Sequence, residues 1–167
     1  MRILNVELRN YRGVSERLVE FAPQGVTIIE GPNEIGKSSI PEAIDRLIED
    51  MDSSSKQRVM AVKPVDRDVG PEVMIEAEAG AYAFTYRKRF IRDRITELDI
   101  VRPHPEHHTG REAHERVQAI LSETVDMALW KALRMQQGDV VGQAALIDQT
   151  SLSAALDSCV RIKVSKI

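Results

Sequence analysis

The sequence predicts an α/β fold: a mixed sheet with an antiparallel β subdomain and flanking helices. A short β-branched run at 26–29 precedes a loop bounded by Gly31 and Gly36, and apolar residues at helical spacing follow that loop. Further along the chain, segments that alternate apolar and polar side chains are separated by turn signals. The first pattern indicates a strand–loop–helix unit, and the second indicates antiparallel strands.

The N-terminal part is expected to carry three strands. Residues 2–9 alternate apolar and polar side chains, which predicts a half-buried strand. Gly13 marks a turn, and residues 18–21 predict a second strand. A tight connection at 23–25 then leads into residues 26–29, which we expect to form a buried strand.

An amphipathic helix is expected directly after the glycine-bounded loop. Pro41 is tolerable there because it falls near the first turn, whose N–H groups lack carbonyl partners. The apolar residues recur at i, i+3, i+4, i+7 and i+8, which places them on one face. This face comprises Ile40, Ala43, Ile44, Leu47 and Ile48.

The middle of the chain predicts the antiparallel β subdomain. A polar loop at 52–56 is followed by expected strands at 73–77, 82–86 and 95–101, with hairpin signals between them. Residues 102–110 are rich in Pro and His and predict a loop.

Helical patterns dominate the last third. Thr109 and Glu112 form a T-x-x-E capping box, which predicts the start of a helix. Residues 129–135 and 144–157 also predict helices. The buried face of the first of these helices is expected at Ala113, Val117, Ile120 and Leu121.

Residues 31–38 read GPNEIGKS and fit the phosphate-loop pattern G-x-x-x-x-G-K-[ST]. Because a strand pattern precedes the loop and a helix pattern follows it, the match predicts a P-loop NTPase fold with ATP and Mg²⁺ as cofactors. Lys37 would contact the β- and γ-phosphates, and Ser38 would ligate Mg²⁺. The alternative is a turn that binds no ligand. The expected phosphate cradle comprises Asn33, Glu34, Ile35, Gly36, Lys37, Ser38 and Ser39.

Composition narrows the class of protein. With 167 residues and 43% hydrophobic content, the chain can bury a core and predicts one domain. The net charge of −3 provides no global basic field for nucleic acid or an anionic membrane. The sequence has no long apolar run, and its one cysteine, Cys159, cannot form an internal disulfide. We therefore expect a cytoplasmic protein with no membrane partner.

Three motifs occur in a specific order: ILNVELRNYRG near the N-terminus, GPNEIGKSS from residue 31, and a Gln-Gly-acid turn at 137–139. This combination resembles the N-terminal lobe of an ABC-class, AAA-family ATPase head of the SMC/SbcC type. The GPNE-x-GKS variant is similar to the bacterial YhaN-like branch. The resemblance covers residues 1–157.

The resemblance implies roles for two further residues. Arg12 matches the arginine that contacts the nucleotide near the phosphates, where a guanidinium would offer bidentate donors. Gln137 matches the glutamine that reaches Mg²⁺ or the attacking water, so it is expected to be catalytic with Lys37 and to ligate the metal with Ser38. The alternatives are a solvated strand-end arginine and an ordinary polar turn.

Several elements of that family have no counterpart in this sequence. It contains no apolar strand ending in Asp-Glu, no LSGG-like signature and no later switch histidine. In the family these elements lie on a C-terminal lobe that follows a long coiled coil. We therefore expect residues 1–157 to be an N-terminal lobe and 158–167 a tail of uncertain origin. The implied partners are the C-terminal lobe, a second head, DNA and a nuclease.

Two clusters have competing interpretations. The basic run at 87–94 could contact DNA, or it could be a solvated face of the sheet. His104, His107 and His108 with Glu106 could hold a metal, although a solvated loop fits the Pro-rich context better.

The leading functional hypothesis is the ATP-binding lobe of an SMC/SbcC-like ATPase in DNA repair or chromosome maintenance. ATP binding and hydrolysis would drive engagement of two heads. The alternatives are a stand-alone P-loop kinase or NTPase, and a non-catalytic truncated remnant.

Overall fold

The computed structural model describes residues 1–25, 27–31 and 36–132. Residues 1–124 form one compact unit, and a second unit begins at Val125. Among the described residues, no helix is both long and apolar enough to cross a membrane.

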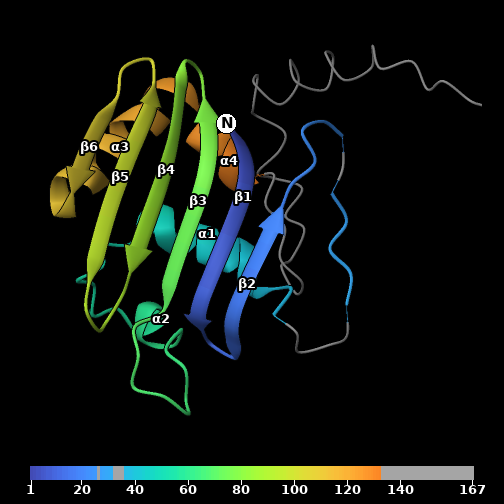
Figure 1. Cartoon of the computed structure of the whole chain (residues 1–167), viewed down its shortest axis with the longest axis vertical. Coiled ribbons are helices and arrows are strands. Elements are labelled where there is room, and N and C mark those ends of the chain that lie inside the picture. Colours follow the sequence, from blue (N-terminus) through green and yellow to red (C-terminus); the bar gives the residue numbers. More distant parts are fainter. Residues whose placement is uncertain (26, 32–35, 133–167) are drawn as a thin grey trace, which may run out of the picture. The chain divides into compact units, whose positions relative to one another are not determined.

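The first unit is built on a six-stranded sheet in the order β2-β1-β3-β4-β5-β6 (Figure 1). Every neighbouring pair of strands in this sheet is antiparallel. The antiparallel subdomain is therefore confirmed, while the mixed sheet stays a prediction. The strands are β1 (Arg2–Tyr11), β2 (Val14–Glu20), β3 (Glu72–Ala79), β4 (Tyr82–Arg89), β5 (Ile95–Arg102) and β6 (Glu106–Thr109).

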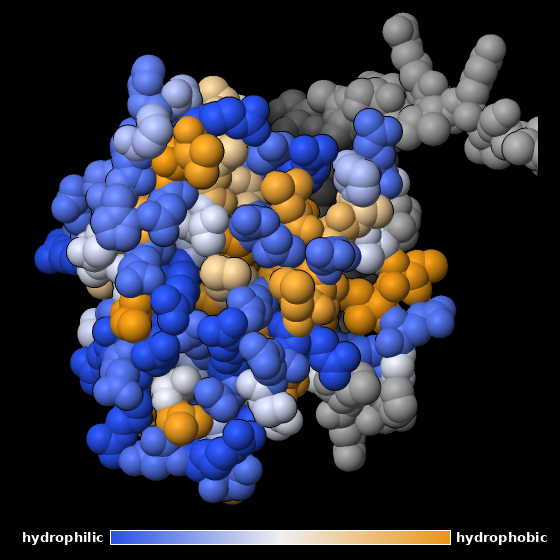
Figure 2. All heavy atoms as spheres, in the orientation of Figure 1, coloured by the Kyte–Doolittle hydropathy of each residue, from blue (hydrophilic) through white to orange (hydrophobic). Residues whose placement is uncertain are grey.

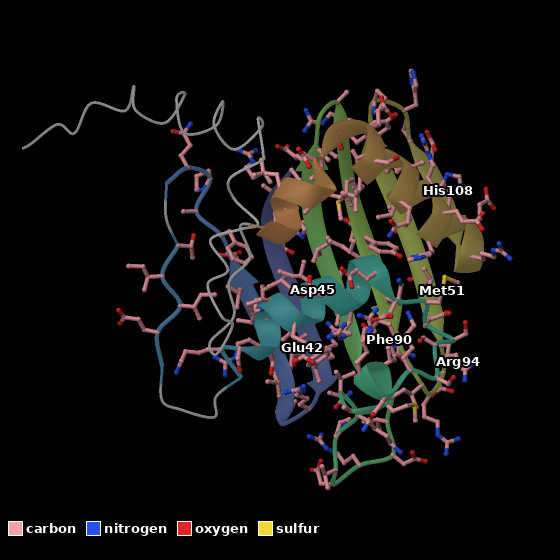
Figure 3. The ribbon with its side chains drawn as sticks, turned by 180° about the vertical axis from the view of Figure 1, so that it is seen from behind. Glu42, Asp45, Met51, Phe90, Arg94 and His108 are labelled. Atoms are coloured by element: carbon pink, nitrogen blue, oxygen red, sulfur yellow. The ribbon has the colours of Figure 1, made fainter. Side chains whose placement is uncertain are left out.

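Two helices of the first unit, α1 (Ser39–Glu49) and α3 (Gly110–Thr124), cover one face of the sheet, as the view from behind shows (Figure 3). A short helix, α2 (Gln57–Met60), follows α1, and α4 (Met127–Ala132) belongs to the second unit. Both expected apolar stripes, on α1 and on α3, are buried. Burying each large aliphatic side chain contributes about 1.5–3 kcal/mol, so packing on the sheet is what holds these helices. Their partners on the strands include Val6, Leu8, Val73, Ile75, Phe84, Leu98 and Ile100.

The opposite face of the sheet carries charged side chains in paired arrangements. Glu72 lies between two arginines, with Arg87 Nε at 2.9 Å and Arg89 Nη2 at 2.7 Å. Figure 2 looks onto this face and shows mostly hydrophilic side chains with scattered apolar ones. Lys88 lies between the two arginines in sequence but is fully buried, because neighbouring residues of a strand point to opposite faces. The sequence grouped Lys88 with a solvated basic run, and that assignment is wrong.

Two segments differ from their sequence prediction. Residues 27–31 form no strand, and Ile28 is 75% exposed. A strand needs a hydrogen-bonded neighbour, and none of the described strands pairs with this segment. Residues 106–109, expected to be a loop, instead pair with β5 as strand β6. Pairing with an available sheet edge has overridden the local loop signal of Pro and His.

Candidate phosphate-binding site

The phosphate-loop motif ends in a tight backbone turn at the start of α1. Gly36 has a φ of +91°, and a β-carbon there would lie 2.4 Å from Cγ2 of Val14. Only glycine fits this position, because both the backbone conformation and the contact exclude a side chain. The first residue of β2 therefore presses directly against the end of the loop.

Lys37 reaches back across the loop. Its ammonium donates a hydrogen bond to the carbonyl oxygen of Gly31, the glycine at the other end of the motif. The two ends of the loop are thus linked by the cation expected to contact phosphates. A phosphate oxygen could replace this neutral carbonyl as a stronger, charged acceptor.

The N-terminus of α1 offers donors and a positive dipole at the same place. Ser38 is the N-cap, and its exposed hydroxyl makes no capping hydrogen bond to the helix. Ser39 is buried at the first helical position and donates its N–H to Gly36 at 3.1 Å. A hydroxyl that makes no capping bond and the positive end of the helix dipole, both at this end of α1, suit Mg²⁺ and phosphate oxygens.

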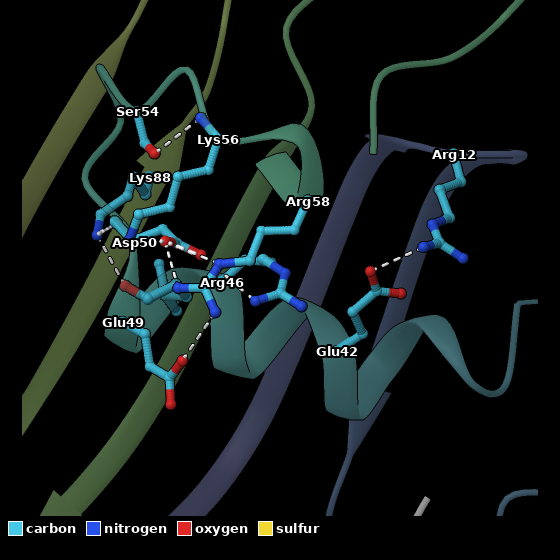
Figure 4. A network of polar contacts seen from close by, with 10 residues as sticks. Arg12, Glu42, Arg46, Glu49, Asp50, Ser54, Lys56, Arg58 and Lys88 are labelled. Atoms are coloured by element: carbon cyan, nitrogen blue, oxygen red, sulfur yellow. Dashed lines mark hydrogen bonds and ion pairs between the residues drawn. The ribbon is translucent and has the colours of Figure 1, made fainter. Parts of the chain in front are cut away.

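The turn between β1 and β2 brings Arg12 to the first turn of α1. Arg12 has a φ of +51°, and its N–H donates to the carbonyl oxygen of Val62 at 2.8 Å. Its Nη2 lies 2.8 Å from Oε1 of Glu42, one turn into α1 (Figure 4). Arg12 and Lys37 are 25 positions apart in the sequence, yet both lie at the N-terminal end of α1.

Tyr11 lies beside this pair and is fully buried. Its hydroxyl has no hydrogen-bond partner among the described residues. Burial, reinforced by the charge of Glu42, raises the pKa of this phenol well above its ordinary value. Tyr11 therefore stays neutral and packs as an aromatic side chain beneath the turn.

Asp50 closes the C-terminal end of α1 with an ion-pair network (Figure 4). Its fully buried carboxylate accepts from Arg58 at 2.6 Å, Lys56 at 3.3 Å and Arg46 at 3.4 Å. Burial alone would raise the pKa of Asp50, but hydrogen bonds from Arg58 and Lys56 lower it overall. The charged carboxylate thus ties α1 to the segment that carries α2.

Lys88 fastens the same end of α1 to the sheet. Its ammonium donates to the carbonyl oxygens of Leu47 at 2.8 Å and Asp50 at 2.6 Å. His114 Nδ1, from α3, lies 3.2 Å away. The Lys88 ammonium thus supplies donors to carbonyls at the C-terminal end of α1, so the helix behind the phosphate loop is fixed at its far end.

The histidines expected in a loop take part in ion pairs of β6. His108 lies 2.9 Å from both Glu106 and Glu112, and its hydrogen bonds with Glu106 first and Glu112 second raise the pKa of His108. His107 pairs with Asp99 at 2.6 Å. No group of three or more acidic, His or Cys side chains in the described part of the chain could hold a metal ion.

A small hollow of about 40 Å³ lies beside the loop and is lined in part by Val14, Ile29, Gly36 and Lys37. Pockets that enclose a whole small-molecule ligand have volumes of about 300–1,000 Å³. The described residues around this hollow therefore do not enclose a whole nucleotide.

The structure brings together several of the residues expected from sequence: Arg12, Gly36, Lys37, Ser38 and Ser39. Asn33, Glu34, Ile35 and Gln137 lie outside the described residues, so their roles stay predictions. Sequence reasoning missed Glu42 and Val14. Glu42 could be recognised only as an acidic residue in a first helical turn, because its partner Arg12 lies 30 positions earlier.

Comparison with known proteins identifies the family of the chain and some of its relatives. Residues 1–101 match the family model of the AAA ATPase domain. The chain is also 48% identical over 157 residues to uncharacterized proteins of Mycobacterium tuberculosis (strain H37Rv) and Mycobacterium bovis. The aligned region covers 94% of this chain and 18% of each relative, so the chain spans less than a fifth of their length.

Proposed function

Because this chain belongs to the AAA ATPase domain family, we propose that it binds Mg-ATP through the loop at 31–39 and is the N-terminal lobe of a larger ATPase head. The observation that carries the proposal is the loop end itself. Gly36 is locked against Val14, and Lys37 spans the loop to Gly31 at the N-terminus of a buried helix. This arrangement places the Lys37 ammonium at the positive end of the α1 dipole, where phosphate oxygens are favoured.

The residues present suit a bound Mg-ATP. Lys37 would exchange the Gly31 carbonyl for β- and γ-phosphate oxygens, and the helix N-terminus would add N–H donors. Ser38 would hold Mg²⁺, with Gln137 as a second ligand. The metal would neutralise charge on the transferring phosphoryl group.

The finer assignment is an SMC/SbcC-like head of the YhaN-like branch that acts in DNA repair or chromosome maintenance. Arg12 at the loop end supports it, as does the length of the relatives, which leaves room for coiled coil and a C-terminal lobe. Ile28 and Ile29 support it further, since apolar side chains exposed next to a phosphate loop fit a segment that pairs with strands of another lobe.

A second head, DNA and a nuclease remain proposed partners. Arg87 and Arg89 are already paired with Glu72, which lowers the free positive charge of the basic run. Arg92 is more exposed but is itself paired with Asp68 at 2.8 Å, so DNA contact is better tested on the exposed Arg94.

The proposal is tested by changing Lys37→Ala and measuring Mg-ATP affinity by isothermal titration. We expect most of the affinity to be lost, because Lys37 is the mobile cation of the loop. Arg111→Ala, which removes an exposed cation from α3, is the control and should leave affinity unchanged. Equal affinity of wild type and Lys37→Ala would reject the phosphate-binding site.

A further inference from the structure

Glu42 is a partly buried carboxylate that the proposed nucleotide site leaves unexplained. We propose that Glu42 is a positioning residue: it holds the guanidinium of Arg12 over the first turn of α1, with Nε and Nη1 directed to the nucleotide phosphates. This inference rests on the proposed function and adds a specific role to that site.

The pair itself is asymmetric. Arg12 Nη2 lies 2.8 Å from Glu42 Oε1, and the Glu42 side chain is 16% exposed whereas that of Arg12 is 45% exposed. Glu42 is therefore the anchored partner, and the guanidinium is the one that an incoming ligand can reach. Within the described part of the chain, Nη2 is the nitrogen that meets Glu42, which leaves the N–H groups of Nε and Nη1 for another acceptor.

The backbone fixes the same arrangement from the other side. A φ of +51° is unfavourable for a residue with a β-carbon, and such conformations persist only when neighbouring contacts hold them. The hydrogen bond from the Arg12 N–H to Val62 is one such contact, and the Glu42 ion pair is the second. Together they direct the side chain onto α1, beside the loop end that Val14 presses on.

When phosphates bind, either Arg12 keeps its ion pair with Glu42 or the phosphates take Arg12 away from Glu42. The charge around Glu42 favours the first outcome. If phosphates simply took Arg12 away from Glu42, a partly buried carboxylate would be left uncompensated near a polyanion, which is costly. Arg46 also lies on α1, but it is hydrogen-bonded to Asp50. Retaining the Arg12–Glu42 pair cancels the negative charge while a charged donor still faces the phosphates, so positioning is the favoured outcome.

A double-mutant cycle tests this inference by isothermal titration of Mg-ATP into the 167-residue chain. Arg12→Ala and Glu42→Ala should each weaken binding by about tenfold, the size of one charged hydrogen bond. The double variant should be no weaker than Arg12→Ala alone, because Glu42 acts through Arg12. Glu42→Gln can still accept from Arg12 and should recover much of the affinity.

Glu49→Ala is the matched control, since Glu49 lies on α1 but pairs with Arg58 at the far end. It should leave affinity unchanged. Thermal unfolding of each variant separates a binding effect from a loss of fold, and the isosteric Glu42→Gln keeps the test decisive if Glu42→Ala unfolds.

The outcomes separate the two proposals. Additive losses in the double variant, or tighter binding by Glu42→Ala, would overturn the positioning role while Lys37→Ala still abolished binding. Coupling between Arg12 and Glu42 with undiminished binding by Lys37→Ala would instead overturn the phosphate-loop proposal. No binding by the wild-type chain would overturn both.

Discussion

Gly36 and Val14 approach each other so closely that a β-carbon on Gly36 would lie 2.4 Å from Val14 Cγ2. The contact joins the end of the phosphate loop to the first residue of β2. Since β2 is fastened to β1 along its length, the loop end is held by the sheet as well as by α1. The position of the loop therefore depends on the absence of a side chain at residue 36.

Gly36→Ala should weaken Mg-ATP binding and lower the free energy of unfolding by about 1–3 kcal/mol, the usual cost of a strained backbone or an overpacked contact. Both causes apply here, because φ is +91° and Val14 blocks the new methyl group. Chemical denaturation measures the stability loss, and isothermal titration measures the binding loss.

Gly25→Ala is the matched control for this variant. Gly25 has a similar φ of +86°, but a β-carbon there would meet no atom within 4 Å. The Gly25 variant should show the backbone cost alone and keep its ATP affinity. Adding Val14→Ala to Gly36→Ala should recover the steric part. Equal losses in the two glycine variants would show that the Val14 contact is unimportant.

Lys88→Met should destabilise the fold by about 3 kcal/mol, since buried acceptors left without a donor cost about 1–3 kcal/mol each. The variant removes the donor from the carbonyls of Leu47 and Asp50 at the end of α1. Urea denaturation measures the change. Lys56→Met, which removes a 63% exposed lysine that also contacts Asp50, should cost about 1 kcal/mol or less. Similar losses in both would argue against the role of Lys88.

Lys88 also makes stability depend on pH. Burial lowers the pKa of Lys88 to about 7 from its ordinary value of 10.5, against the charges of Asp52 and Asp50, which raise it. Between these two values the unfolded chain binds more protons than the folded chain, so stability rises with pH. Below a pH of about 7, Lys88 is protonated in the folded and in the unfolded chain, so its contribution to stability no longer changes with pH.

We therefore expect the free energy of unfolding to rise from pH 7.5 to 9.5 relative to Lys88→Met, by at most about 1.4 kcal/mol per pH unit. The neighbouring His114 has a pKa lowered by burial and by Lys88, so it titrates below this window. Tyr86, which also faces His114, has a pKa raised by burial and stays protonated there. Parallel curves for wild type and Lys88→Met would contradict the expectation.

Periodicity predicted the parts of the fold that local burial determines. The stripes of α1 and α3 and the strands β3, β4 and β5 follow from regular spacing of apolar residues, and the structure confirms them. The tight turn at Gly36 was also predicted from the motif, which is local, and its φ of +91° confirms the turn.

Features that depend on contacts between segments far apart in the sequence could not be predicted from the sequence. Lys88 looked like one member of a basic run, yet the end of α1, about 40 positions away in the sequence, supplies its acceptors. Glu42 pairs with Arg12, 30 positions earlier in the sequence, and β6 forms because β5 offers an edge. In each case a contact between remote segments outweighed the local pattern.

The last prediction concerns turnover of ATP. We expect the 167-residue chain to bind Mg-ATP but to hydrolyse it very slowly. Phosphoryl transfer relies on positioning and charge stabilisation, and in the proposed site Lys37, Ser38 and Arg12 would serve those tasks. Glu42, the acidic residue in the first turn of α1, is paired with Arg12 and is therefore not free to orient an attacking water.

The measurement is release of inorganic phosphate by wild type, Lys37→Ala and Gln137→Ala, with and without the C-terminal part of a longer relative. Supplying that part in trans should restore hydrolysis, because in the SMC/SbcC-like heads that the sequence resembles the acidic pair and the signature loop lie on a C-terminal lobe. The restored activity should fall in Gln137→Ala if Gln137 reaches the metal or the water. Rapid hydrolysis by the 167-residue chain alone, lost in Lys37→Ala, would instead favour a stand-alone P-loop enzyme with its own catalytic acid.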